Sequence, residues 1–220
     1  MSRTLKALSA LLTYPTEDLA AAVPEIHSAL AADAALTRRQ LAQIGPLLSR
    51  LGAADTMAAE EAYVGLFDRS RLLSLHLFEH VHGESRDRGQ AMVDLLGLYA
   101  RSGYEVATDE LPDYLPLFIE FLSTRSDAEA KESLADVAHI LGAMHGRLRG
   151  RDDAYAAVLA ALLALAGAPV DDAAREPVDD SDDALDRAWE ETPVTFGPGG
   201  LGEQGSCGKV AGMLERMRIQ

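Results

Sequence analysis

Apolar residues recur at three- and four-residue spacing along most of this chain, and that periodicity constrains its fold more than any other feature. Alanine and leucine, which favour helix, fill most of these positions, and the β-branched residues that favour strands are sparse. No pair of alternating segments predicts two strands, and no glycine-rich loop follows a strand. The sequence therefore predicts an all-α helical bundle and does not support dinucleotide-binding or Walker folds.

Capping residues predict where the helices begin and end. Thr16, Asp55, Ser126 and Asp152 are expected N-caps, and Gly52 is expected to stop a helix with a positive φ. Pro112 is expected at the first position of its helix. The predicted helices cover approximately residues 5–12, 16–32, 37–51, 55–67, 73–81, 85–101, 113–122, 126–148 and 152–167.

The composition changes after Gly167. We predict one helical domain over residues 1–167, and over residues 168–220 an acidic, glycine-rich, largely mobile tail. Residues 171–191 hold ten acids and two arginines, a net −8 within a chain total of −15. A short helix is expected near residues 182–190, and residues 209–220 could form another that docks or stays detached.

Charge and cysteine content limit the class of protein. A net charge of −15 argues against non-specific nucleic-acid binding and favours a basic partner. No apolar run approaches the roughly 20 residues that span a bilayer, so direct membrane insertion is not expected. The single cysteine, Cys207, excludes an internal disulfide and fits a cytoplasmic protein. The basic, apolar N-terminus resembles a secretory signal, but Pro15 ends it without an A-x-A site.

Residues 61–121 concentrate aromatic, histidine, arginine and proline residues and are the expected functional region. Rim carboxylates around an apolar groove would suit a basic amphipathic helix. The alternative is that the aromatic side chains are simply core. The candidate groove consists of Tyr63, Phe67, Tyr114, Leu117 and Phe118, with Glu110 and Asp113 at its rim and His80 nearby.

Two further patterns in this region suggest ligand chemistry. The motif H-x-x-E-H is formed by His76, Glu79 and His80. On a helix these side chains could bind Zn²⁺, and the protein could then be a zinc-dependent hydrolase. The alternative is that the histidines pack or form hydrogen bonds within a loop. Clustered arginines suggest two alternatives. We favour intramolecular ion pairs to Asp68, Glu79 or Glu84; the other alternative is contact with an anion or a cofactor. These arginines are Arg69, Arg71, Arg86 and Arg88.

Several motifs in fixed order resemble the NarJ family of nitrate reductase molybdenum-cofactor assembly chaperones, relatives of TorD and DmsD. They are FD at residues 67–68, SL-x-L-FEH-x-HG-x-SR-x-RG at 74–89, AM at 91–92 and ELPDYLPL-x-x-EFL at 110–122. LLTYP at residues 11–15 also looks like the family. The strong similarity covers about residues 58–123. His76 stands where the family is expected to carry tyrosine, which argues against a zinc ligand there.

This resemblance implies an all-helical, cytoplasmic and non-catalytic protein. It implies a system-specific chaperone that binds the apo catalytic (alpha) subunit of respiratory nitrate reductase, including that subunit's N-terminal peptide. It also implies that the chaperone binds no cofactor permanently but assists insertion of molybdopterin guanine dinucleotide into the client. Neither a catalytic residue nor a metal site is expected, and a homodimer is left open.

Overall fold

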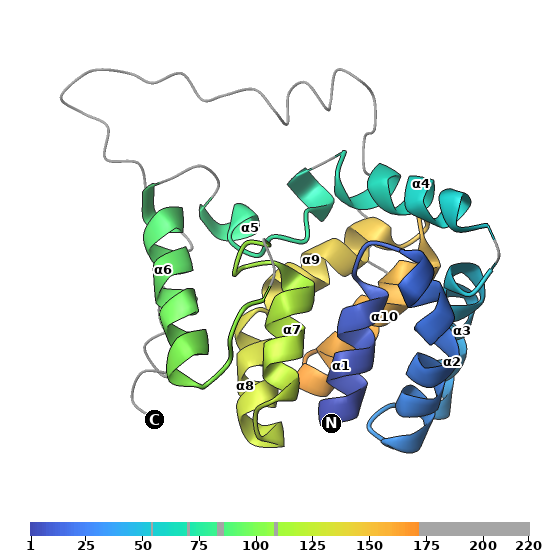
Figure 1. Cartoon of the computed structure of the whole chain (residues 1–220), viewed down its shortest axis with the longest axis horizontal. Helices are drawn as coiled ribbons and strands as arrows, with labels where there is room; N and C mark the ends of the chain where they lie inside the picture. The colour runs from blue at the N-terminus through green and yellow to red at the C-terminus, as the bar shows by residue number, and fades with distance from the viewer. Residues whose placement is uncertain (54, 70, 83–85, 108–109, 172–220) are drawn as a thin grey trace.

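The computed structural model describes residues 1–171, except residues 54, 70, 83–85 and 108–109 (Figure 1). Over these residues the secondary structure is helical, with a single isolated β-bridge and no regular strand, so the all-α prediction is confirmed. Predictions for residues 172–220 lie outside the described residues. In order, the elements are α1 (Ser2–Leu11), α2 (Glu17–Ala32), α3 (Arg38–Leu51), α4 (Thr56–Phe67), η1 (Arg71–Leu73), α5 (Glu79–His82), α6 (Arg86–Arg101), α7 (Leu115–Ser123), α8 (Asp127–Asp136), α9 (Ala138–Leu148) and α10 (Asp153–Ala166).

Helix α10 lies at the centre of the bundle, packed against α3, α8 and α9 (Figure 1). Its sequence is apolar around most of its circumference, which is typical of a helix buried on all sides. Helix α1 packs along α7 and beside α2, and its leucines Leu5, Leu8 and Leu11 are fully excluded from solvent or nearly so. The apolar periodicity of the sequence therefore corresponds to one continuous core.

The predicted N-caps are confirmed. The Thr16 hydroxyl accepts a hydrogen bond from the Leu19 amide, and the Asp55 carboxylate accepts one from the Ala58 amide. Ser126 forms a reciprocal capping box with Glu129. Asp152 accepts two amides at the start of α10, and Gly167 ends that helix at a φ of 73°.

Two predictions about helix ends are wrong. Gly52 follows α3 with a φ of −83°, so no left-handed conformation is needed there. A Cβ on Gly52 would lie 3.3 Å from Val23 Cγ1, so the glycine leaves room for α2. The long helix predicted for residues 126–148 is two helices, because Val137 (φ −96°, ψ 3°) separates α8 from α9.

The helix predicted over residues 73–81 is also wrong in its first half. Only Arg71–Leu73, as a 3₁₀ turn, and Glu79–His82 are helical there. Between them the chain is not helical, turns at residues 77–78 and pairs with the segment before α7. The Leu77 amide donates to the Asp113 carbonyl (3.0 Å), and the Leu115 amide donates to the Leu75 carbonyl (2.7 Å). An antiparallel bridge joins His76 to Tyr114.

That pairing moves the start of α7. The helix begins at Leu115 with Pro116 in its first turn, so Pro112 does not occupy the first helical position. The Asp113 carbonyl accepts the Leu77 amide, so it is not available for an intrahelical hydrogen bond, and the first carbonyl to accept one is that of Tyr114, from Phe118.

Helix α6 stands at the flank of the molecule (Figure 1). It buries Ala91, Leu95 and Tyr99, whereas Leu96 is 44% exposed. None of the described helices is both long and apolar enough to cross a membrane.

Candidate functional site

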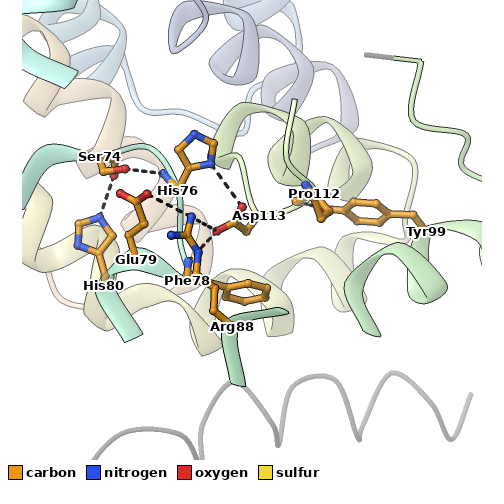
Figure 2. A network of polar contacts seen from close by, with 9 residues as sticks. All are labelled: Ser74, His76, Phe78, Glu79, His80, Arg88, Tyr99, Pro112 and Asp113. Carbon is orange, nitrogen blue, oxygen red and sulfur yellow. Dashed lines mark hydrogen bonds and ion pairs between the residues drawn. The ribbon is translucent and has the colours of Figure 1, made fainter. Parts of the chain in front are cut away.

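A buried polar network joins the segment after η1 to the segment before α7 (Figure 2). At its centre is the Asp113 carboxylate, which has no exposed surface. Its Oδ2 accepts the Phe78 amide at 3.1 Å, and its Oδ1 lies 3.3 Å from His76 Nδ1. The prediction that Asp113 lies at an exposed rim is therefore wrong. Asp113 instead holds two loops together, because a buried carboxylate needs such partners.

The residues of the H-x-x-E-H motif each contact a protein partner. His76 pairs with Asp113, Glu79 pairs with Arg88 at 3.1 Å, and His80 Nε2 lies 2.8 Å from the Ser74 carbonyl (Figure 2). His76 precedes α5 in extended chain, so the two histidines do not share one helical face. No metal-binding group of three or more side chains occurs in the described part of the chain. This arrangement does not favour the zinc-hydrolase interpretation.

The two histidines titrate differently. The hydrogen bond with Asp113 raises the pKa of His76, although partial burial opposes that shift. Burial lowers the pKa of His80, and the nearby Arg147 guanidinium acts in the same direction. Because a carbonyl oxygen only accepts, His80 Nε2 is the protonated nitrogen that donates to Ser74. His80, predicted near the groove, thus lies in α5 and supports the segment after η1 through the Ser74 carbonyl.

The five side chains predicted to form an open groove are mostly core. Tyr63, Phe67, Leu117 and Phe118 are buried, and Tyr63 contacts Phe67 with ring centroids 4.9 Å apart. Only Tyr114 of the five is partly exposed. The prediction that these five side chains line an open groove is therefore wrong, and the alternative that the aromatic residues are core is confirmed for Tyr63, Phe67 and Phe118.

Aromatic and acidic side chains from three parts of the chain do meet at the surface beside this core. The Tyr63 hydroxyl lies 3.1 Å from that of Tyr114, and its ring lies 5.6 Å from that of Tyr14, which is 42% exposed. Helix α4 and the residue after it add the half-buried Glu60 and the exposed Val64 and Asp68 at four-residue spacing. We call this surface the tyrosine face; it comprises Tyr14, Glu60, Val64, Asp68, Glu110 and Tyr114.

The carboxylates of the tyrosine face act on its tyrosines. Partial burial raises the pKa of Tyr14, and the charges of Glu60 and Asp68 raise it further. Burial likewise raises the pKa of Tyr114, with smaller contributions from Glu110 and Asp68. These side chains therefore share one negative field around partly exposed aromatic rings, an arrangement that attracts a cationic and apolar partner.

The four arginines singled out in the sequence do not form one site. Arg88 pairs with Glu79 and lies 4.0 Å from Asp113, so the ion pair that we favoured is confirmed for this residue. Arg69 is exposed and Arg71 is half-buried in η1, where Arg147 donates to the Leu72 carbonyl. The Arg86 side chain lies outside the described part. An anion or cofactor contact at Arg69 and Arg71 stays a prediction.

Of the tyrosine face, the sequence analysis predicts only Glu110 and Tyr114 as site residues. Tyr14 lies in the LLTYP motif, and Glu60 and Val64 lie within a predicted helix without any other mark. The i, i+4, i+8 spacing of Glu60, Val64 and Asp68 was the available signal. Nothing in the sequence placed Tyr14 beside Tyr63, because that contact spans many residues.

Comparison with known proteins identifies the class to which this fold and surface belong. The chain is a member of the nitrate reductase delta subunit family, whose family model matches residues 16–161.

Individual relatives narrow the class. The chain is 43% identical over 198 residues to the nitrate reductase molybdenum cofactor assembly chaperone NarJ of Escherichia coli K12, covering 87% of this chain and 84% of the relative. It is 42% identical to the probable chaperone NarW of the same strain, covering 87% and 83%. It is 30% identical over 164 residues to a probable NarJ of Bacillus subtilis 168, covering 73% and 86%.

Proposed function

We propose that this chain is an assembly chaperone for respiratory nitrate reductase. It binds the apo catalytic (alpha) subunit, including that subunit's N-terminal peptide, and promotes insertion of the molybdenum cofactor and assembly of the complex. Two observations support the proposal: the relatives are named as molybdenum cofactor assembly chaperones, and the tyrosine face gathers apolar and acidic groups at the surface.

The tyrosine face suits one kind of client segment. Tyr14 and Val64 expose 42% and 37% of their surface and can contact the apolar side of an amphipathic helix. Asp68 and Glu110, both exposed, can pair with lysine or arginine on its other side. Burying a few such side chains contributes several kcal/mol at about 25 cal/mol per Å², before the cost of ordering the peptide. This favours a moderate affinity, as release of the client requires.

In this proposal the chaperone acts on the client rather than on the cofactor. It holds no cofactor permanently, and the molybdopterin guanine dinucleotide enters the catalytic subunit while that subunit is bound. It acts without catalysis, because Asp113, His76 and Glu79 are engaged in the polar network that supports the loops. Arg69 and Arg71 are the residues proposed to contact an anionic group of the cofactor during transfer.

A cytoplasmic location is part of the proposal. The single cysteine supports it, since a chain without disulfides fits a reducing compartment. A homodimer stays a prediction that sedimentation of the purified chain would test. Fractionation of cells that express a tagged chain would test the location.

Calorimetric titration with a synthetic N-terminal peptide of the catalytic subunit tests the proposal. We expect saturable binding that weakens as ionic strength rises, because the carboxylates of the tyrosine face steer a basic peptide. A peptide of the same composition in scrambled order is the control. Absence of heat, together with failure of the peptide to compete with the intact subunit, would refute binding through that segment.

Cofactor insertion needs its own measurement. We expect the catalytic subunit isolated from cells without this chain to hold much less molybdenum than the subunit from complemented cells. A normal molybdenum content in cells that lack the chain would contradict the proposed role in insertion even if the peptide bound.

A further inference from the structure

Besides the tyrosine face, the described residues contain a cavity of about 480 Å³ between α3 and α10. Small side chains of α10 (Ala154, Ala157 and Ala160) form one wall at three-residue spacing, which leaves space beside the helix. We call this cavity the α3–α10 groove; its lining consists of Thr37, Arg39, Gln40, Gln43, Pro46, His145, Arg149, Asp153, Ala154, Ala157, Ala160 and Val170.

The chain itself re-enters this groove after α10. Gly167 takes a left-handed conformation (φ 73°), and the Ala168 amide donates to the Leu163 carbonyl at 2.9 Å, which turns the backbone back along the helix. Three residues later Val170 lines the groove and packs against the core. Fifty residues follow position 170 in the sequence, and they therefore start from inside the groove.

The charges of the groove and of the following residues are complementary. Arg39 and Arg149 line the groove, with Asp153 3.3 Å from Arg149 as the single acid of the lining. Residues 171–180 (DDAAREPVDD) carry five acids and one arginine. The tyrosine face, by contrast, is itself acidic and repels this segment.

We propose that the α3–α10 groove is the docking site of the chain's own residues 171–180. Val170 anchors the segment, small apolar side chains such as Ala173 and Ala174 enter the space beside the α10 alanines, and carboxylates pair with Arg39 and Arg149. Docking there keeps the acidic region that follows away from the tyrosine face and leaves that face open to a basic client. The inference does not depend on the proposed function.

Limited trypsin digestion of the full-length chain tests the docking. The sequence offers two sites in the acidic region, Arg175 inside the proposed segment and Arg187 beyond it. In Arg39→Glu/Arg149→Glu we expect cleavage after Arg175 to be about five-fold faster, as the loss of two surface ion pairs implies, with cleavage after Arg187 unchanged. Arg38→Glu is the matched control, because Arg38 is exposed on α3 next to Arg39 but does not line the groove.

A second variant covers the case in which the groove substitutions disturb the fold. Asp171→Asn/Asp172→Asn changes only the segment and should release Arg175 to a similar extent, with the circular dichroism of the helices unaltered. Equal cleavage rates at Arg175 in the wild-type chain, both double variants and Arg38→Glu would overturn the proposal. Faster cleavage in the groove variant, together with a wild-type cleavage rate in the segment variant, would also overturn the proposal. That result would point to an exogenous anion as the occupant.

Discussion

The buried carboxylate of Asp113 lies 3.3 Å from Nδ1 of His76, a residue 37 positions earlier in the sequence. The other oxygen of this carboxylate, Oδ2, accepts the Phe78 amide and lies 4.0 Å from the Arg88 guanidinium. Through these contacts one side chain connects the segment after η1, the loop before α7 and the first turns of α6 (Figure 2). A buried side chain therefore fixes the relative positions of the two segments that carry the longest family motifs, residues 74–89 and 110–122.

Asp113→Ala should lower the free energy of unfolding by about 3–5 kcal/mol, because it leaves the half-buried His76 imidazole and the buried Phe78 amide without their partner. Urea unfolding followed by circular dichroism measures this. The control is Glu110→Ala, an exposed carboxylate close by in the sequence, for which we expect a change within about 0.5 kcal/mol. Similar small effects in both variants would show that the buried network contributes little.

His76 should make stability depend on pH with a definite sign. Its pKa is raised in the folded protein, so its contribution is fully present below the unfolded pKa of about 6.5 and is lost as pH rises through the folded pKa. The difference in unfolding free energy between wild type and His76→Gln should therefore be largest in acid and should shrink at alkaline pH.

His80 contributes in the opposite direction, because its lowered pKa destabilises the fold as pH falls. This contribution is the same in wild type and His76→Gln, so it cancels in the difference between their unfolding free energies. Asp113, Glu79 and Arg88 face His76, and Arg147 faces His80, so their charges remain in both proteins. A difference that grew with pH would contradict the assigned pair.

Core residues of α7 should affect stability strongly. Leu117 is 7% exposed and Phe118 is fully buried, so Leu117→Ala should cost about 2–5 kcal/mol and Phe118→Ala about 3–5 kcal/mol. Thermal and urea unfolding measure both. Leu96→Ala, an exposed leucine on α6, is the control and should change little. A small loss for Phe118→Ala would be incompatible with its packing here.

Charge reversal on the tyrosine face should separate binding from stability. Asp68→Lys should weaken binding of the client peptide by about 1 kcal/mol or more, because it replaces attraction of the basic peptide by repulsion. The same substitution should change the free energy of unfolding by no more than about 0.5 kcal/mol, since Asp68 is exposed. Glu25→Lys makes the same charge change on exposed α2, outside the tyrosine face, and should preserve affinity. Equal losses in both variants would indicate a general charge effect and remove Asp68 from the site.

Much of the site could not be predicted from sequence. Of the residues predicted to form the groove, the aromatic Tyr63, Phe67 and Tyr114 do lie close to one another. Their orientation was not predictable: Tyr63 and Phe67 point inward, and the surface tyrosine beside them, Tyr14, comes from the loop after α1. A residue type indicates what a side chain can contact, but its exposure depends on which distant segment covers it.

The amino-acid sequence by itself determined the helical class of the fold and the starts of α2, α4, α8 and α10, because apolar periodicity and N-caps act over only a few residues. Tertiary structure alone decided that residues 74–78 are not helical and that Asp113 is buried. Both outcomes depend on hydrogen bonds between segments more than thirty residues apart, which form only after the core has brought those segments together.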